Sequence, residues 1–135
     1  MCLQKDPVTA AWFGGLMSDR ICLHVILYAT EGFFKSRPGE DRSYLELLHY
    51  AEALRLLRER LSVPEDELCI SDSTIMVVLT LAGAAEFTGD REAAMNHRDG
   101  FSRMVSLRGG LEAMKGYEGA MRIKVCKSVT TQLAY

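Results

Sequence analysis

One stretch decides the fold of this chain: Asn96-His97-Arg98-Asp99-Gly100-Phe101-Ser102-Arg103-Met104-Val105-Ser106-Leu107-Arg108-Gly109-Gly110-Leu111. Its apolar residues recur at steps of three and four positions, which places them on one face of a helix, and most polar residues fall on the other face. The double glycine predicts where the helix ends, because glycine adopts the left-handed conformation that closes a helix at little steric cost. The Gly89-Asp90 pair predicts a turn and a cap, so we expect this helix to cover residues 91–108.

The sequence around this stretch is also helical in pattern. Apolar periodicity, capping residues and turn signals predict further helices over residues 8–16, 18–34, 44–61, 74–87 and 117–133. The helix over 18–34 is apolar nearly all round, so we expect it at the centre of the core. The helix over 44–61 is amphipathic, and its apolar pattern predicts a buried stripe. The stripe consists of Tyr44, Leu47, Ala51, Leu54, either Leu57 or Arg58, and Leu61. The expected fold is therefore one all-α domain over residues 1–135, with antiparallel helix pairs and about six to seven helices.

The stretch that ends in the double glycine resembles the fungal-specific transcription factor domain. That domain is the all-helical regulatory region that follows a zinc binuclear-cluster DNA-binding domain in many fungal regulators. The shared pattern is a histidine, a glycine three residues later, a bulky apolar residue, and an apolar run that closes on Leu-Arg-Gly-Gly. Its members here are His97, Gly100, Phe101, Met104, Val105, Leu107, Arg108, Gly109 and Gly110. The likeness extends over residues 44–115 and includes the helix start at Ser71-Asp72.

The resemblance implies a role in transcription through protein-protein interaction in the nucleus, with no catalysis and no cofactor. In that family the corresponding region is only the opening part of a longer helical domain, so this chain looks like a portion of it. A portion leaves an apolar seam uncovered, and soluble monomers rarely leave large apolar patches bare. We therefore expect a homo-oligomer or a complex with another helical regulator.

Composition and charge exclude several classes of protein. The chain has 135 residues, of which 48% are hydrophobic and 25% charged, and its formal net charge is -2. This composition is typical of a globular domain, and the charge argues against direct contact with nucleic acid. The longest apolar run, residues 21–29, is far too short to span a membrane, and the start lacks the features of a secretory signal. These features favour an intracellular protein.

The cysteines predict no metal site. They are far apart, without the short spacing of zinc ligands or the six-cysteine cluster that supplies DNA binding in the family that the chain resembles. Scattered cysteines among apolar residues are typical of a reducing compartment, where buried thiols act as small apolar side chains. The four are Cys2, Cys22, Cys69 and Cys126.

The residues that could carry chemistry are few. His97 and Glu86 could meet across the turn at Gly89 and act as a general acid and base, or simply tie two helices together, which we consider the better interpretation. The alternative function is a small helical enzyme or accessory protein of fungal secondary metabolism, with His97, Glu86 and His24 lining a pocket. No ligand or nucleophile motif accompanies them.

Two residues of the motif carry structural expectations. A glycine inside a helix costs up to about 1 kcal/mol relative to alanine, so Gly100 indicates that another helix passes close by. Arg108 is expected to bind a helix C-terminus or a carboxylate rather than a phosphate, and Glu86 is one candidate partner.

Overall fold

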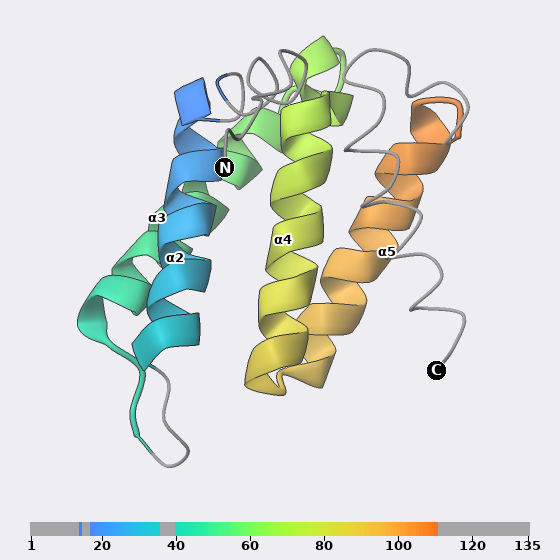
Figure 1. Ribbon diagram of the computed structural model, residues 1–135. Coiled ribbons are helices and arrows are strands. Elements are labelled where there is room, and N and C mark those ends of the chain that lie inside the picture. Colours follow the sequence, from blue (N-terminus) through green and yellow to red (C-terminus); the bar gives the residue numbers. More distant parts are fainter. Residues whose placement is uncertain (1–13, 15–16, 36–39, 111–135) are drawn as a thin grey trace, which may run out of the picture.

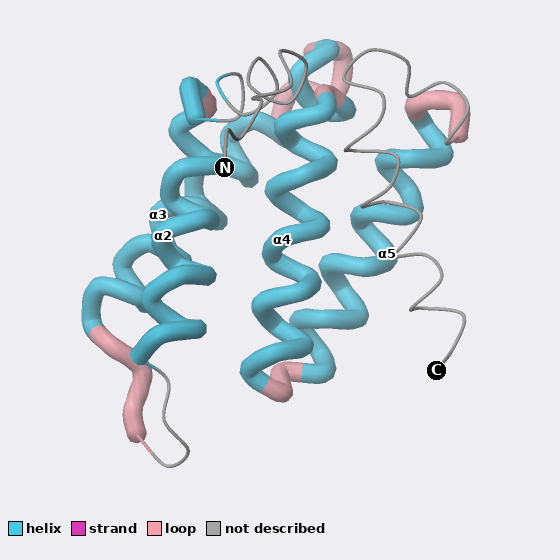
Figure 2. Tube along the Cα trace, viewed as in Figure 1, coloured by secondary structure: helices cyan, strands magenta, loops and turns pink. Residues whose placement is uncertain are grey.

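The computed structural model describes residues 14, 17–35 and 40–110. Within these residues the regular structure is entirely helical (Figures 1 and 2), which confirms the all-α class. Four α-helices follow one another as α2 (Arg20–Lys35), α3 (Tyr44–Leu61), α4 (Asp72–Thr88) and α5 (Arg91–Leu107). A short 3-10 helix, η1 (Glu67–Ile70), precedes α4.

The number of helices differs from the prediction. The described residues contain four α-helices, where the sequence predicted about six to seven for the whole chain. Apart from Gly14, the helices expected over 8–16 and 117–133 lie outside the described residues. Both segments contain paired glycines or residues of weak helix propensity, so their sequence signal was the poorest of the six.

The helices run alternately down and up and form two antiparallel pairs, α2 with α3 and α4 with α5 (Figure 1). Helix α4 lies between α2 and α5 and contacts both of them. Its buried residues come from all sides of the helix, because it has a neighbour on each flank. They are Thr74, Ile75, Met76, Val77, Val78, Leu81, Ala82 and Ala85.

The prediction that the helix over 18–34 forms the centre of the core is therefore wrong. Helix α2 buries one face and leaves Ile26, Leu27, Phe33 and Phe34 exposed on the other. Helix α4 is the more uniformly apolar of the two, because its charged residues lie only near its ends, whereas α2 carries polar and charged residues along its length. Helix α4 is the central helix because it lies between two neighbouring helices.

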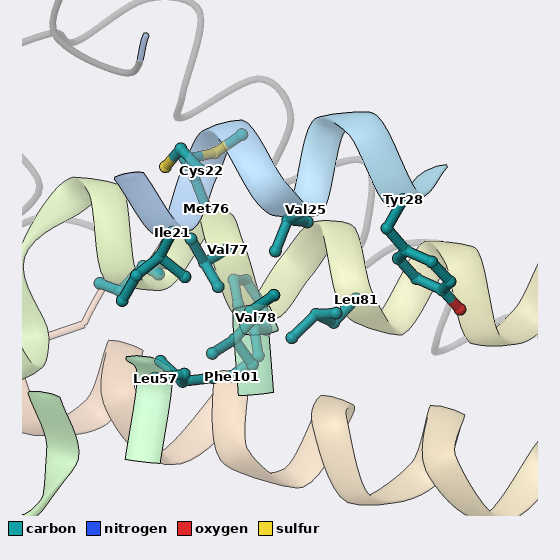
Figure 3. Packing of buried hydrophobic residues seen from close by; sticks show 12 residues of the cluster. Ile21, Cys22, Val25, Tyr28, Leu57, Met76, Val77, Val78, Leu81 and Phe101 are labelled. Atoms are coloured by element: carbon teal, nitrogen blue, oxygen red, sulfur yellow. The ribbon is translucent and has the colours of Figure 1, made fainter. Parts of the chain in front are cut away.

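One hydrophobic cluster holds the four helices together (Figure 3). Val25 of α2, Ile75 and Leu81 of α4, and Phe101 of α5 are among its fully buried side chains. Burying a side chain of this size contributes about 1.5–3 kcal/mol relative to leaving it in water. This cluster supplies most of the packing energy of the described fold.

The boundaries of α4 and α5 follow from local capping. The Ser71 side chain accepts a hydrogen bond from the Thr74 N–H and starts α4, and Gly89, at φ 77°, closes it in the left-handed conformation. The Asp90 side chain then accepts from the Ala93 N–H and starts α5. These contacts confirm the predicted turn at Gly89-Asp90.

The double glycine also ends α5 as predicted. Gly109 and Gly110 have φ values of 100° and 82°, and the Gly110 N–H donates to the Val105 carbonyl at 2.9 Å. Only glycine adopts such conformations without strain. The stretch that decides the fold is therefore one helix with a glycine stop.

Helix α3 has the predicted boundaries, but only part of the predicted stripe faces the core. Its buried residues are Glu46, Ala53 and Leu57. Of the expected stripe, Leu57 is buried and Leu54 packs against the core, whereas Tyr44, Leu47, Ala51 and Leu61 are exposed. Ala53 is fully buried, so a small side chain lets the helix approach the core closely. The predicted stripe is therefore wrong at the four exposed positions, because more than one face of α3 carries apolar residues.

Candidate functional site

The motif residues of α5 serve mainly in packing. Phe101 is buried in the core, Met104 packs against the core edge, and Leu107 is exposed. A Cβ placed at Gly100 would meet Val78 Cγ1 of α4 at 3.9 Å, so α4 does pass beside Gly100, at an ordinary contact distance. The glycine is therefore not required by a tight helix crossing.

Arg108 connects the end of α5 to the start of α4. Its Nη1 donates to the Ile70 carbonyl at 3.1 Å and forms an ion pair with Asp72. The arginine thus binds a carboxylate, as predicted, but the partner is Asp72 and not Glu86. Glu86 forms an ion pair with Arg98 instead. Arg98 and Arg108 thus both connect α5 to α4 or η1.

The three residues of the enzyme hypothesis lie on three different helices, His24 on α2, Glu86 on α4 and His97 on α5. His97 is half-buried; burial lowers its pKa, and the charge of Asp90 opposes this shift. His24 Nδ1 lies 3.1 Å from His49 Nδ1, and burial followed by the charge of His49 lowers the pKa of His24. Glu86 is held by Arg98, and none of the three residues lines the cavity that lies between α2 and α4.

A polar network that the sequence did not reveal joins four elements. Arg60, at the end of α3, donates to both carboxylate oxygens of Asp19 at 2.8 and 3.0 Å. It also donates to Thr74 Oγ1 of α4 at 3.1 Å, and Thr74 Oγ1 donates to the Leu68 carbonyl of η1. Asp19 caps α2 as well, since its Oδ1 accepts from the Ile21 N–H at 2.9 Å.

The ionisation of Asp19 reflects this network. Burial alone would raise its pKa, but the hydrogen bonds from Arg60 and Ser73, with the charge of Arg60, outweigh burial and lower the pKa below 3.8. Both side chains are largely shielded, with exposed fractions of 11% for Asp19 and 16% for Arg60. The contact is therefore a shielded ion pair rather than a solvated one. Its role is structural.

The cysteines of the described residues behave as predicted for buried thiols. Cys22 and Cys69 are free and buried. Burial, with the charge of Asp19, raises the pKa of Cys22 to about 12, so this thiol is a poor nucleophile. No group of three or more metal-binding side chains occurs among the described residues, and none of their helices is long and apolar enough to cross a membrane.

The outward face of α3 exposes several large apolar residues. Its first two turns expose Tyr44 by 77%, Leu47 by 46% and Leu48 by 47%, and Ala51 is exposed beside them. We call these four residues the α3 patch. Farther along the same face stand Arg55 and Arg58, which are exposed and charged. The outward face of α3 is thus apolar at its start and charged at its end.

Comparison of the chain with protein-family models, with curated proteins and with solved structures found no match. The resemblance to the fungal-specific transcription factor domain stays a prediction that rests on the residues of α5 and their order.

Proposed function

We propose that this chain is a transcription-regulator-like protein-protein interaction module that lacks its own DNA-binding domain and acts in the nucleus. The α3 patch is the observation that carries the interaction. The transcriptional part rests on the resemblance of residues 97–110 to the fungal-specific transcription factor domain.

The α3 patch has the composition of a helix-packing face. Tyr44, Leu47, Leu48 and Ala51 follow the three- and four-residue steps of one helix face, which is the arrangement that a partner helix covers. Each large residue of this face gains about 25 cal/mol for every Å² of apolar surface removed from water. Covering the patch is therefore favourable, and the outward residues of α2, Ile26 and Leu27, add further apolar surface.

The charged end of the same face restricts the orientation in which a partner can bind. A twofold axis near the patch would bring the apolar turns of two copies together and leave Arg55 and Arg58 in water. A helical partner of another sequence would need an acidic residue opposite Arg58 to cover the whole face, because Arg55 already pairs with Glu52 and Glu59 of α3. A second copy of the chain is the partner that the first experiment tests.

Light scattering during size-exclusion chromatography tests the proposal. We expect the wild-type chain to exceed the monomer mass of 15.1 kDa at high concentration. The double change Leu47→Glu and Leu48→Glu should restore the monomer mass, because it places charges in the contact. Arg58→Glu is the matched control, since it changes charge on the same helix face outside the patch and should leave the mass unaltered.

If the partner is a different protein, crosslinking detects it where the mass of the purified chain does not. A photo-crosslinker at position 48 should then join the partner, and one at position 58 should do so less efficiently. A chain that stays monomeric and shows no crosslink favouring position 48 would contradict the proposal.

The enzyme hypothesis has no observation in its favour here. None of its three residues, His24, Glu86 and His97, lines the cavity between α2 and α4, so we do not propose it further.

A further inference from the structure

A cavity of about 320 Å³ lies between the second halves of α2 and α4. Small residues on the two helices create it, with Ala29 and Gly32 on α2 and Gly83 and Ala84 on α4. A Cβ placed at Gly83 would meet nothing within 4 Å, which shows how open the space is. Protein interiors are normally close-packed, and a hollow of this size matches the lower range of small-molecule pockets.

The cavity wall is apolar except at a few points. Phe33 and Phe87 line it with their rings 5.3 Å apart, and both are largely exposed, so the cavity reaches the surface there. The hydroxyl protons of Thr80 and Thr88, which also line it, are used within α4, where they bond to the Met76 and Ala85 carbonyls. These hydroxyls therefore offer a ligand acceptor oxygens rather than donors.

One carboxylate enters this apolar space. Glu46, from the first turn of α3, lines the cavity and is only 1% exposed. Its Oε1 has no hydrogen-bond partner within the described part of the chain. The Nε of Arg42 forms an ion pair with Oε1 at 3.7 Å, a distance too long for a hydrogen bond, so the hydrogen-bonding capacity of Oε1 stays unused.

A buried carboxylate oxygen without a hydrogen-bond donor lowers the stability of the fold, so a donor from a ligand would stabilise it. A buried acceptor left unpaired costs about 1–3 kcal/mol, and a charged one costs more. Gly32 makes room for this carboxylate, because a Cβ there would lie 3.2 Å from Oε1. The cavity thus presents a buried acceptor, a set of small apolar residues, and aromatic rings at the opening.

We propose that this cavity binds a small amine with an apolar or aromatic body, whose ammonium group donates to Glu46 Oε1. The apolar body fills the space between Gly32 and Gly83, and the rings of Phe33 and Phe87 pack against it. An anionic ligand of the same shape is repelled by Glu46, and a neutral one loses the charge-assisted hydrogen bond. This site is separate from the α3 patch, so its test does not depend on the proposed function.

Three probes of similar shape test the site by isothermal titration: 2-phenylethylamine, 2-phenylethanol and phenylacetate. We expect the amine to bind the wild-type chain about tenfold or more tightly than the alcohol, and the acid to bind most weakly. Glu46→Gln preserves the shape of the side chain and should reduce the affinity for the amine to that for the alcohol. Glu59→Gln, an exposed change on the same helix, is the matched control and should leave all affinities unaltered.

A second variant fills the space. Gly83→Leu places a larger side chain where the structure has room, and it should abolish binding of the amine and the alcohol without loss of helical circular dichroism. If Glu46→Gln fails to fold, the order of the probes in the wild type and their loss in Gly83→Leu still decide the matter. Equal affinity for the three probes, no binding at millimolar concentration, or unaltered binding in Gly83→Leu would overturn the proposal.

Discussion

Replacing Arg60 by methionine should destabilise the chain more than any comparable change on the surface of α3. Methionine preserves the long unbranched stem and good helix propensity, so the change removes the guanidinium alone. The loss includes the hydrogen bonds to Asp19 at 2.8 and 3.0 Å and the one to Thr74 at 3.1 Å. Asp19 would then retain its backbone donors at the start of α2 as partners in a shielded place.

The magnitude follows from these contacts. A hydrogen bond to a charged group contributes about 1.5–3 kcal/mol, and removing one partner of a fully buried ion pair costs about 3–5 kcal/mol. The residual exposure of Asp19 and Arg60 lets water replace part of the loss, so we expect a decrease of about 2–3 kcal/mol in the free energy of unfolding. For a chain of this length that lowers Tm by roughly 8–12 °C.

Urea unfolding, followed by circular dichroism, measures this effect. Arg58→Met is the matched control: it makes the same chemical change on the exposed side of the same helix, and it should alter stability by less than about 0.5 kcal/mol. A double-mutant cycle with Asp19→Asn, which preserves the helix cap, should give a coupling energy of about 1–2 kcal/mol. Equal losses for Arg60→Met and Arg58→Met, or a coupling energy near zero, would refute the reasoning.

Two further predictions concern α5 and the histidines. Gly100→Ala should raise the free energy of unfolding by up to about 1 kcal/mol, because the new Cβ lies 3.9 Å from Val78 Cγ1 and the helix gains propensity; a loss measured in urea would mean that α4 lies closer than described. Folding lowers the pKa of His24 and that of His97 below 6.5, so the unfolded chain binds protons more readily than the folded chain. The free energy of unfolding is therefore highest above pH 6.5 and decreases as the pH falls below it. Changing both histidines to glutamine should flatten this decrease between about pH 7.5 and 5.5, and parallel urea midpoints for the two proteins would contradict the assignment.

The parts of the fold that could be predicted are those with local signals. Helix α5 begins at an aspartate cap and ends at two glycines, and each of these acts within a few residues of its own position. The same holds for the turn at Gly89. Such signals do not depend on the rest of the chain, so the sequence alone was sufficient.

The orientation of α3 could not be predicted in that way. Its core face carries Glu46 and Arg60, which any hydrophobicity pattern places in water. Glu46 lies inside because Gly32 makes room for it, and Arg60 because Asp19 and Thr74 bind it. These partners lie on other helices, so only the tertiary structure reveals them, together with the cavity beside Glu46.

The contact between α2 and α4 has a consequence for how the chain folds. Each antiparallel pair, α2 with α3 and α4 with α5, joins neighbours in sequence, whereas Cys22 of α2 reaches the Ser73 carbonyl of α4 across 51 positions. Contacts between near neighbours form at a lower entropic cost than distant ones. We therefore expect the two hairpins to form first and to dock late, and their separation to be the lowest-energy opening of the native state. The cavity lies along this docking contact, so the motion that begins unfolding would also widen the space in which a ligand binds.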